Sequence, residues 1–222
     1  MSTEQEKEHK FDRETATAMG PYLVSEDPPH YLSAVDLSDI PEMVRVLNIN
    51  KDIYNGTATF QYPYLESHAH ARISRAVDYT TQRGYNTHWA MRTSPDGPLI
   101  GWVHAYILPD PQEVHPETGR ELKVAEIGYW VSPEYVGKGY AVRSAKFVTH
   151  EILFKEFGCD IVRAEAYVEN RSSRKIMEAT GMRCEVEATT AFIPKLQQHR
   201  IVCCYAVHRD QSTYSVVSKG HS

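Results

Sequence analysis

The spacing of apolar residues divides the chain into stretches that alternate and stretches that repeat every three to four positions. In the segment 161–168 the even-numbered positions are all Val or Ala, whereas Arg163, Glu165 and Tyr167 occupy odd-numbered positions. Such alternation is typical of a β-strand with one buried face. The same reasoning predicts seven strands, at about residues 30–32, 88–92, 99–107, 124–131, 161–168, 184–193 and 200–209.

Four helices are predicted from helical spacing, and the first has the clearest start. Asp39 can cap it, Pro41 suits its first turn, and Glu42 completes a capping box. The other helices are expected at about 67–82, from a glycine-rich turn to about 157, and from 170 to 181. The order of elements, with a strand–helix–strand unit at its centre, predicts a mixed α/β fold.

The two ends of the chain are polar, and the patterned segments lie between them. Residues 1–28 end in Asp27-Pro28-Pro29 and predict a flexible tail, as do residues 211–222. A chain of 222 residues can bury one substantial core. We therefore expect a single domain at 29–210.

Composition narrows the classes of partner and the compartment. The formal net charge of -5 argues against nucleic acid as the main ligand. No apolar run reaches the roughly 20 residues that cross a bilayer, and the first residues lack the apolar region of a secretory signal. The four cysteines lack metal-ligand spacing and suit a reduced, cytosolic protein. We expect a cytoplasmic protein without a metal, a membrane or a nucleic acid as partner.

The segment 136–141, which reads VGKGYA, joins a predicted strand to a predicted helix. Glycines let a ligand approach the backbone, and the unpaired amides at a helix start hold phosphate or pyrophosphate well. Taken alone, a glycine turn used only for tight packing is an equally good interpretation. The segment has neither the GxGxxG order of a dinucleotide site nor the order of a P-loop, which argues against a nucleotide-binding protein.

Two further segments give this turn a context. The strand at 125–131 reads AEIGYWV, and residues 170–182 read NRSSRKIMEATGM. In this order and spacing the three segments resemble the GNAT superfamily of acyl-CoA-dependent N-acyltransferases, most closely the branch of ribosomal-protein N-terminal acetyltransferases. The resemblance extends over about residues 30–209. Val136 replaces the usual Gln or Arg, Met182 replaces an aromatic residue, and Met177 stands where many relatives have a tyrosine acid.

The resemblance implies a fold and a cofactor site. The central strand, carrying a bulge, would splay from its parallel neighbour, so that acetyl-CoA lies in the resulting V. The pantetheine arm would pair with the backbone near Trp130 and Val131, and the pyrophosphate would lie on the amides of the glycine turn. The implied acetyl-CoA contacts are Trp130, Val131, Val136, Gly137, Lys138, Gly139, Tyr140, Ala141, Asn170 and Ser173. For Asn170, a simple helix cap is a compatible second role, and Lys138 is nearly as well explained as a solvated loop residue.

Acetyl transfer to an amine needs a base, an oxyanion donor and an acid. Glu126, on the strand that would meet the thioester, is the predicted base, with Glu165 and His104 as weaker alternatives. A surface or ion-paired glutamate is an equally good interpretation of Glu126. A backbone amide at Trp130 or Val131 would hold the oxyanion. Ser173 is the predicted acid, although a serine at a helix start often bonds only its own backbone.

The acceptor site is predicted less specifically. The resemblance places the early helices and the loop with Tyr62 and Tyr64 around it, although aromatic residues are also ordinary core material. The acetyl group would pass directly to a primary amine of a small molecule or a protein N-terminus, within a ternary complex. The alternative is a module that binds CoA and catalyses nothing. The chain would be a monomer or a homodimer.

Overall fold

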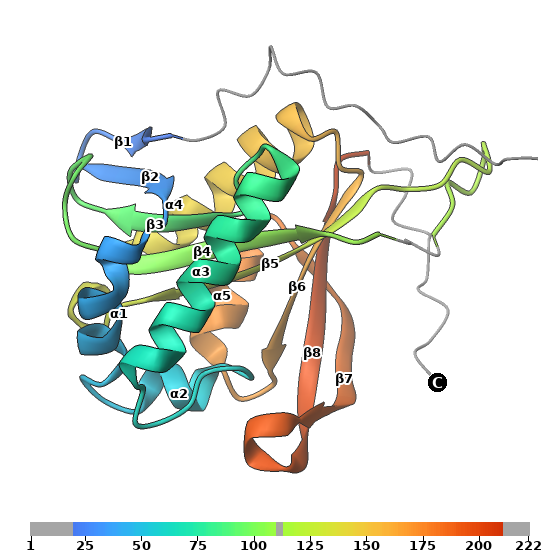
Figure 1. Cartoon of the computed structure of the whole chain (residues 1–222). Helices are drawn as coiled ribbons and strands as arrows, with labels where there is room; N and C mark the ends of the chain where they lie inside the picture. Colours follow the sequence, from blue (N-terminus) through green and yellow to red (C-terminus); the bar gives the residue numbers. More distant parts are fainter. Residues whose placement is uncertain (1–19, 110–112, 211–222) are drawn as a thin grey trace, which may run out of the picture.

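The computed structural model describes residues 20–109 and 113–210, in which eight strands form one sheet in the order β1-β2-β3-β4-β5-β6-β8-β7 (Figure 1). The strands are β1 (Tyr22–Ser25), β2 (His30–Ala34), β3 (His88–Arg92), β4 (Gly101–Ile107), β5 (Val124–Val131), β6 (Ile161–Tyr167), β7 (Arg183–Ile193) and β8 (Gln198–His208). Neighbouring strands are antiparallel except β5 and β6, which are parallel. The mixed α/β sheet expected from the hydrophobic pattern is confirmed.

Helices cover both faces of this sheet. They are α1 (Ile40–Leu47), α2 (Asp52–Gly56), α3 (Glu66–Arg83), α4 (Tyr140–Phe147) and α5 (Arg171–Ala179). In Figure 1, α1 and α3 lie in front of the sheet, and α4 and α5 lie behind it. Helix α4 continues as wider π-helical turns over Val148–Glu156. Single 3-10 turns occur at Leu37–Asp39, Pro133–Tyr135 and Pro194–Leu196.

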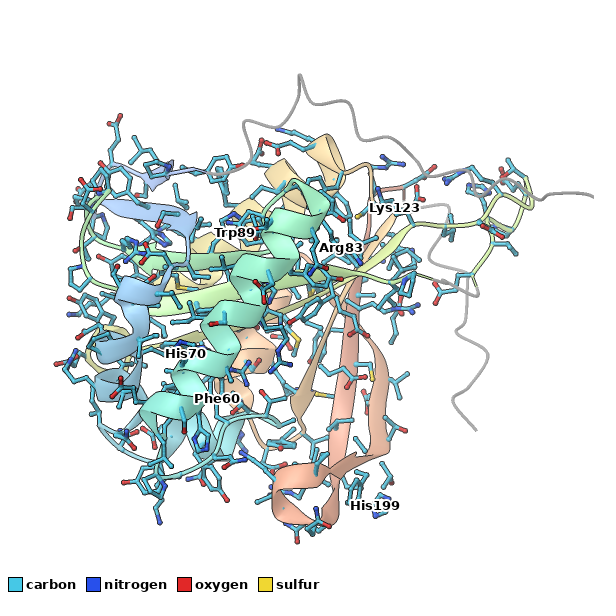
Figure 2. The ribbon with its side chains drawn as sticks, viewed as in Figure 1. Phe60, His70, Arg83, Trp89, Lys123 and His199 are labelled. Atoms are coloured by element: carbon cyan, nitrogen blue, oxygen red, sulfur yellow. The ribbon has the colours of Figure 1, made fainter. Side chains whose placement is uncertain are left out.

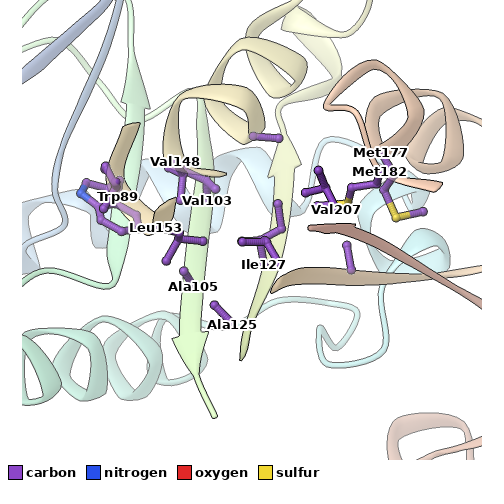
Figure 3. Packing of buried hydrophobic residues seen from close by; sticks show 14 of the residues in the cluster. Trp89, Val103, Ala105, Ala125, Ile127, Val148, Leu153, Met177, Met182 and Val207 are labelled. Carbon is purple, nitrogen blue, oxygen red and sulfur yellow. The ribbon is translucent and has the colours of Figure 1, made fainter. Parts of the chain in front are cut away.

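The strand alternation produces two apolar cores, one on each face of the sheet. The front core joins α1 and α3 to Trp102 and Trp130. The rear core joins α4 and α5 to the opposite side chains of the same strands, among them Val103 and Ile127 (Figure 3). Met177, where many relatives have a tyrosine, is fully buried in the rear core beside Met182. Two of the three departures from the family pattern, Met177 and Met182, are therefore apolar core residues here.

One segment of the predicted N-terminal tail is ordered. Residues Tyr22–Ser25 form β1, which pairs antiparallel with β2 through Tyr22 opposite Leu32. The prediction of a tail over 1–28 is therefore wrong for this segment. Four residues with an interrupted register are too short for a recognisable alternation. Residues 1–19 and the predicted tail at 211–222 lie outside the described residues.

The start of the first helix also differs from the prediction. Asp36, not Asp39, caps the 3-10 turn that leads into α1, and Asp39 completes that capping box. The Asp39 carboxylate also forms a buried ion pair with Arg92, at 2.8 Å from Nη1 to Oδ1. Glu42 bonds Arg45 instead of closing a box. A buried partner on β3 thus determines the role of Asp39, and local spacing does not reveal it.

Three general properties bear on function. No described helix is long and apolar enough to span a membrane. Within the described residues, no group of three or more His, Cys, Asp or Glu side chains is placed to hold a metal ion. All four cysteines are free thiols.

Candidate active site

The divergence of β5 from β6 opens the middle of the sheet. The two strands pair over only three positions, from Val124 opposite Ile161 to Glu126 opposite Arg163, and then separate (Figure 1). The expected splayed V is therefore present. Its cause is not the expected bulge, because β4 and β5 keep one register from Gly101 opposite Val131 to Ile107 opposite Ala125.

Two cavities occupy the V. The first, here called the sheet cavity, has a volume of about 340 Å³ and lies between strands β4 to β8, α3 and the loop 57–60. The second, the turn cavity, has a volume of about 430 Å³ and lies between α2, the glycine turn and the start of α5. The residues that line both are Gly56, Thr57, Tyr129, Trp130, Tyr167 and Ser173. The two cavities therefore meet at the C-terminal half of β5.

The backbone of β5 is oriented so that alternate residues face the V. The Ser132 amide donates to the Ile100 carbonyl at 2.8 Å, and the Val124 carbonyl accepts from Leu108 at 2.9 Å. Because both even-numbered residues face β4, the amides and carbonyls of the odd-numbered residues, including Tyr129 and Val131, face the V. This arrangement supports the prediction for Val131. The Trp130 amide faces β4, so its backbone is less well placed for a pantetheine arm than that of Val131; Trp130 nevertheless lines both cavities, and its acetyl-CoA contact stays a prediction.

The glycine turn presents unpaired amides at the start of α4. Gly137 and Gly139 have φ values of 80° and 79°, a left-handed conformation that side chains disfavour. Within the described residues, the Lys138 amide bonds the Tyr135 carbonyl, whereas the amides of Gly139, Tyr140 and Ala141 have no backbone acceptor. Unpaired amides at a helix start suit a pyrophosphate, so the segment fits the group that the resemblance implies.

The side chains around the glycine turn differ in their exposure and in what they contact. Val136 is 62% exposed and lines the turn cavity together with Ala141. The Lys138 ammonium lies over the Tyr135 ring, 4.9 Å from its centroid, and the Tyr140 side chain is buried in the rear core. Arg143, which the sequence reasoning missed, donates from Nη2 to the Lys138 carbonyl at 3.1 Å. A second cation therefore lies at the turn, one helical turn beyond Gly139.

Asn170 connects the start of α5 to α2. Its Oδ1 accepts from the Ser173 amide at 3.1 Å, which confirms the predicted helix cap. Its Nδ2 donates to the Gly56 carbonyl at 3.2 Å. The side chain therefore fixes one wall of the turn cavity against the other.

Ser173 is paired with a tyrosine that the sequence reasoning did not select. The Tyr129 and Ser173 hydroxyl oxygens are 3.3 Å apart, and the Tyr129 hydroxyl donates to the Ser173 carbonyl at 3.2 Å. Burial raises the pKa of Tyr129 to about 12, with the Ser173 hydrogen bond opposing that rise. The phenol is therefore protonated at neutral pH. The strand motif at 125–131 contains this tyrosine, but its spacing gives no sign of a contact with Ser173.

The three candidate bases differ in whether they line a cavity. Glu165 and His104 line the sheet cavity, whereas Glu126 lines neither cavity. Glu126 is exposed and lies opposite Tyr106 on β4, on the face of β5 that it shares with Gly128 and Trp130. Glu165 accepts from the Cys204 thiol at 3.3 Å.

His104 is packed against the backbone of β5. A Cβ on Gly128 would lie 2.5 Å from His104 Cε1, so only glycine leaves room for this ring. Burial, together with the positive charges of His88 and Arg72, lowers the pKa of His104 to about 3. The ring is therefore neutral at pH 7 and a weak proton acceptor. The glycine of the strand motif is the sequence signal for this close approach.

The two predicted acceptor-binding tyrosines do not line the sheet cavity. Tyr64 is buried in the front core against Phe60 and lines neither cavity, so the cavity lining gives its predicted substrate contact no support. Tyr62 is 39% exposed and packs under the Lys51 ammonium. Phe60, near the N-terminal end of α3, is the aromatic residue of this loop that lines the cavity (Figure 2).

Comparisons with known proteins agree with this geometry. Residues 31–183 match a family model described as an acetyltransferase (GNAT) domain. A ribosomal-protein-S5-alanine acetyltransferase from Vibrio fischeri is 16% identical, with a TM-score of 0.64 over 82% of this chain and 94% of that one. A ribosomal L7/L12 alpha-N-protein acetyltransferase in complex with coenzyme A is 16% identical, with a TM-score of 0.63 over 84% and 98%.

A third similar structure is that of an acetyltransferase named for a different role. It is the microcin C7 self-immunity acetyltransferase MccE with acetyl-CoA and AMP, 15% identical, with a TM-score of 0.64 over 86% of this chain and 98% of that one. No curated protein sequence matches this chain. At these identities the structures establish the fold, and the family model covers well over half of the chain. The chain therefore belongs to the GNAT acetyltransferase family.

Proposed function

We propose that the protein transfers an acetyl group directly from acetyl-CoA to a primary amine, with both substrates bound at once. The observation that carries this proposal is the junction of the two cavities at Tyr129, Trp130 and Ser173. A donor that enters from the turn cavity and an acceptor that enters from the sheet cavity meet there. Direct transfer needs this proximity and no covalent enzyme intermediate.

The turn cavity is the proposed site of acetyl-CoA. The unpaired amides of Gly139, Tyr140 and Ala141 would bind its pyrophosphate, and the Lys138 and Arg143 side chains add positive charge. The backbone groups of Tyr129 and Val131 face the V, where an extended pantetheine arm can pair as an added strand. Asn170 holds the opposite wall in place.

The chemical step would use three groups of this chain. A base removes a proton from the substrate ammonium, and the amine nitrogen then forms a bond to the thioester carbonyl carbon. The Val131 amide stabilises the negative charge that develops on the carbonyl oxygen. As the carbon–sulfur bond breaks, the Ser173 hydroxyl donates its proton to the leaving sulfur and is resupplied by its neighbour, the Tyr129 hydroxyl. The attacking nitrogen releases its second proton as the amide forms, and this proton returns through water to the hydroxyl pair.

Glu126 is the base that we propose, acting through water. It lies on β5, the strand at which the two cavities meet, two residues before Gly128. Glu165 is the competing carboxylate, because it lines the sheet cavity directly. One experiment distinguishes the two assignments of the base. Glu126→Gln should lower kcat at pH 7 by about 10²-fold or more, and Glu165→Gln should lower it by less than about threefold. The opposite pattern would assign the base to Glu165.

Initial rates of thiol release, measured while both substrates are varied, test the order of events. A ternary complex predicts intersecting double-reciprocal lines, and parallel lines would indicate an acetyl-enzyme instead. The second candidate function is a catalytically silent CoA-binding module, which the loss of the tyrosine at Met177 favours. It predicts that acetyl-CoA binds by calorimetry but that no amine releases the thiol.

A further inference from the structure

Arg72 brings a fixed positive charge into the sheet cavity. It projects from α3, and its guanidinium carbon lies 4.3 Å from the centroid of the Phe60 ring. Its Nη2 donates to Thr59 Oγ1 at 3.2 Å. The ring face and the hydroxyl hold the guanidinium at the wall that the loop 57–60 forms.

Within the described residues, Arg72 forms no ion pair with a carboxylate. Its positive charge contributes, after burial, to the lowered pKa values of His88 and His104, so the guanidinium lies within electrostatic reach of His104 in the cavity wall. A guanidinium has five N–H donors, and Thr59 uses only one of them. The Tyr64 hydroxyl is a second polar neighbour of the guanidinium, and the donors that neither oxygen uses can bind a ligand in the cavity.

The other walls of the cavity define the rest of the ligand. Glu165, from β6, supplies a carboxylate that attracts an ammonium group. The rings of Phe60, Trp102, Trp130 and Phe192 supply an apolar lining. One cation, one anion and aromatic walls in a single cavity suit a molecule that has an amine, an acidic group and an apolar portion.

We propose that the acceptor amine carries a carboxylate, which Arg72 binds through paired N–H donors while the amine faces the junction at Trp130 and Ser173. This inference rests on the proposed acetyl transfer and names its acceptor class. A carboxylate matches the planar, bidentate geometry of a guanidinium. It has two sources, a free amino acid and the acidic side chain at the N-terminus of a peptide.

Matched acceptors in a thiol-release assay separate the charge from the apolar portion. The first pair is phenylalanine and 2-phenylethylamine, which differ by the carboxylate alone. The second pair is an aspartyl-alanine amide and an asparaginyl-alanine amide. We expect kcat/KM at least about tenfold higher for the acidic member of one pair, and that pair identifies the source of the carboxylate. Equal or better use of both neutral members would overturn the inference.

Two arginine variants on one helix complete the test. Arg72→Gln should lower kcat/KM for the acidic member at least about tenfold more than for its neutral partner, so that the preference is lost. Arg75, exposed on the same helix and not lining the cavity, provides the matched control, and Arg75→Gln should keep the preference. Equal losses with acidic and neutral acceptors in Arg72→Gln would instead show a packing role and overturn the inference.

A binding measurement distinguishes failure of this inference from failure of the proposed function. N-acetylphenylalanine and N-acetyl-aspartyl-alanine amide, the products of the two acidic acceptors, are each titrated by calorimetry into the parent and into Arg72→Gln in the presence of CoA. Binding that weakens at least about tenfold in the variant supports the carboxylate site even if no amine is turned over. Equal affinity in the two proteins rejects the site, even where thiol release shows that acetyl transfer occurs.

Discussion

At the residue scale, the site depends on close contacts between side chains that lie far apart in the sequence. Ser173 at the start of α5 meets Tyr129 in the middle of β5, and their hydroxyl oxygens are 3.3 Å apart. The buried phenol keeps its proton, since burial raises the pKa of Tyr129 to about 12. A pair of neutral hydroxyls can supply a proton to a leaving thiolate at neutral pH. We propose that in this chain the pair takes the acid role that the family resemblance gives to a tyrosine at position 177.

We therefore predict that Ser173→Ala lowers kcat by about 10²-fold, and that Tyr129→Phe lowers it by about tenfold. Because the two hydroxyls act as one unit, the double variant should be about as slow as Ser173→Ala alone. The measurement is kcat by thiol release at saturating substrates, with calorimetry to confirm that acetyl-CoA affinity stays within about threefold. Multiplicative effects in the double variant would show that the hydroxyls act independently.

The residues of the site were predictable from the sequence to different degrees. Ser173, Asn170 and the glycine turn belong to motifs with fixed spacing, and the structure places them around one pair of cavities. Phe60 and Tyr64 belong to the same loop, but only packing against α3 decides which of them lines the sheet cavity. Arg72 carries no local signal, because an arginine on a polar helix face is ordinary until its neighbours are known.

At the scale of elements, β5 and the start of α4 contribute to the candidate site mainly through backbone groups, as the resemblance implies. The odd-numbered residues of β5 face the V, and the first amides of α4 face the turn cavity. Long, regular elements such as α3 and β4 were predictable because their patterns repeat. Strand β1 and helix α2 span only four and five residues, which is too short for a period to be recognised.

The glycine turn gives a prediction about cofactor affinity. A Cβ at Gly139 would lie 2.7 Å from Arg143 Nη1, so Gly139→Asp adds a carboxylate beside this cation at the proposed pyrophosphate site. We expect the Kd for acetyl-CoA, measured by calorimetry, to rise at least about tenfold, because two negative charges at close range repel.

Gly119 offers a matched control for this change. It also has a positive φ, of 68°, but lies in the loop between β4 and β5, and a Cβ there meets nothing within 4 Å. Gly119→Asp adds the same charge and similar backbone strain, and it should leave the Kd within about twofold. An unchanged Kd in Gly139→Asp would remove the pyrophosphate from this turn.

At the scale of the whole molecule, packing keeps several histidines neutral. Burial, with the Arg143 charge, lowers the pKa of His30 to about 4, and burial, with the charges of Arg72 and Arg75, does the same for His88. His30 lies between β2 and α4, where its Nε2 is 3.0 Å from Ser144 Oγ. The folded state is therefore more stable when these imidazole rings are uncharged.

The free energy of unfolding should consequently fall as the pH is lowered from about 6.5 to about 4. The unfolded chain takes up these protons near pH 6.5, whereas the folded chain resists them until about pH 4, so acid favours the unfolded state. His30→Gln should flatten this dependence by on the order of 2 kcal/mol. His70→Gln, at an exposed position on α3, is the control and should leave the slope unchanged (Figure 2). Urea unfolding at pH 7 and pH 4.5 provides the measurement, and identical slopes for parent and His30→Gln would contradict it.

The central claim is that two cavities meet at the C-terminal half of β5 so that an amine takes an acetyl group directly from acetyl-CoA. The most direct measurement is thiol release from isotopically labelled acetyl-CoA across amines and N-terminal peptides, with mass spectrometry of each acceptor. We expect labelled acetyl-amine to form in equal amount to the free thiol, and this product to be largely lost with Ser173→Ala. Acetyl-CoA that binds but acetylates no acceptor would contradict the account and leave a CoA-binding module.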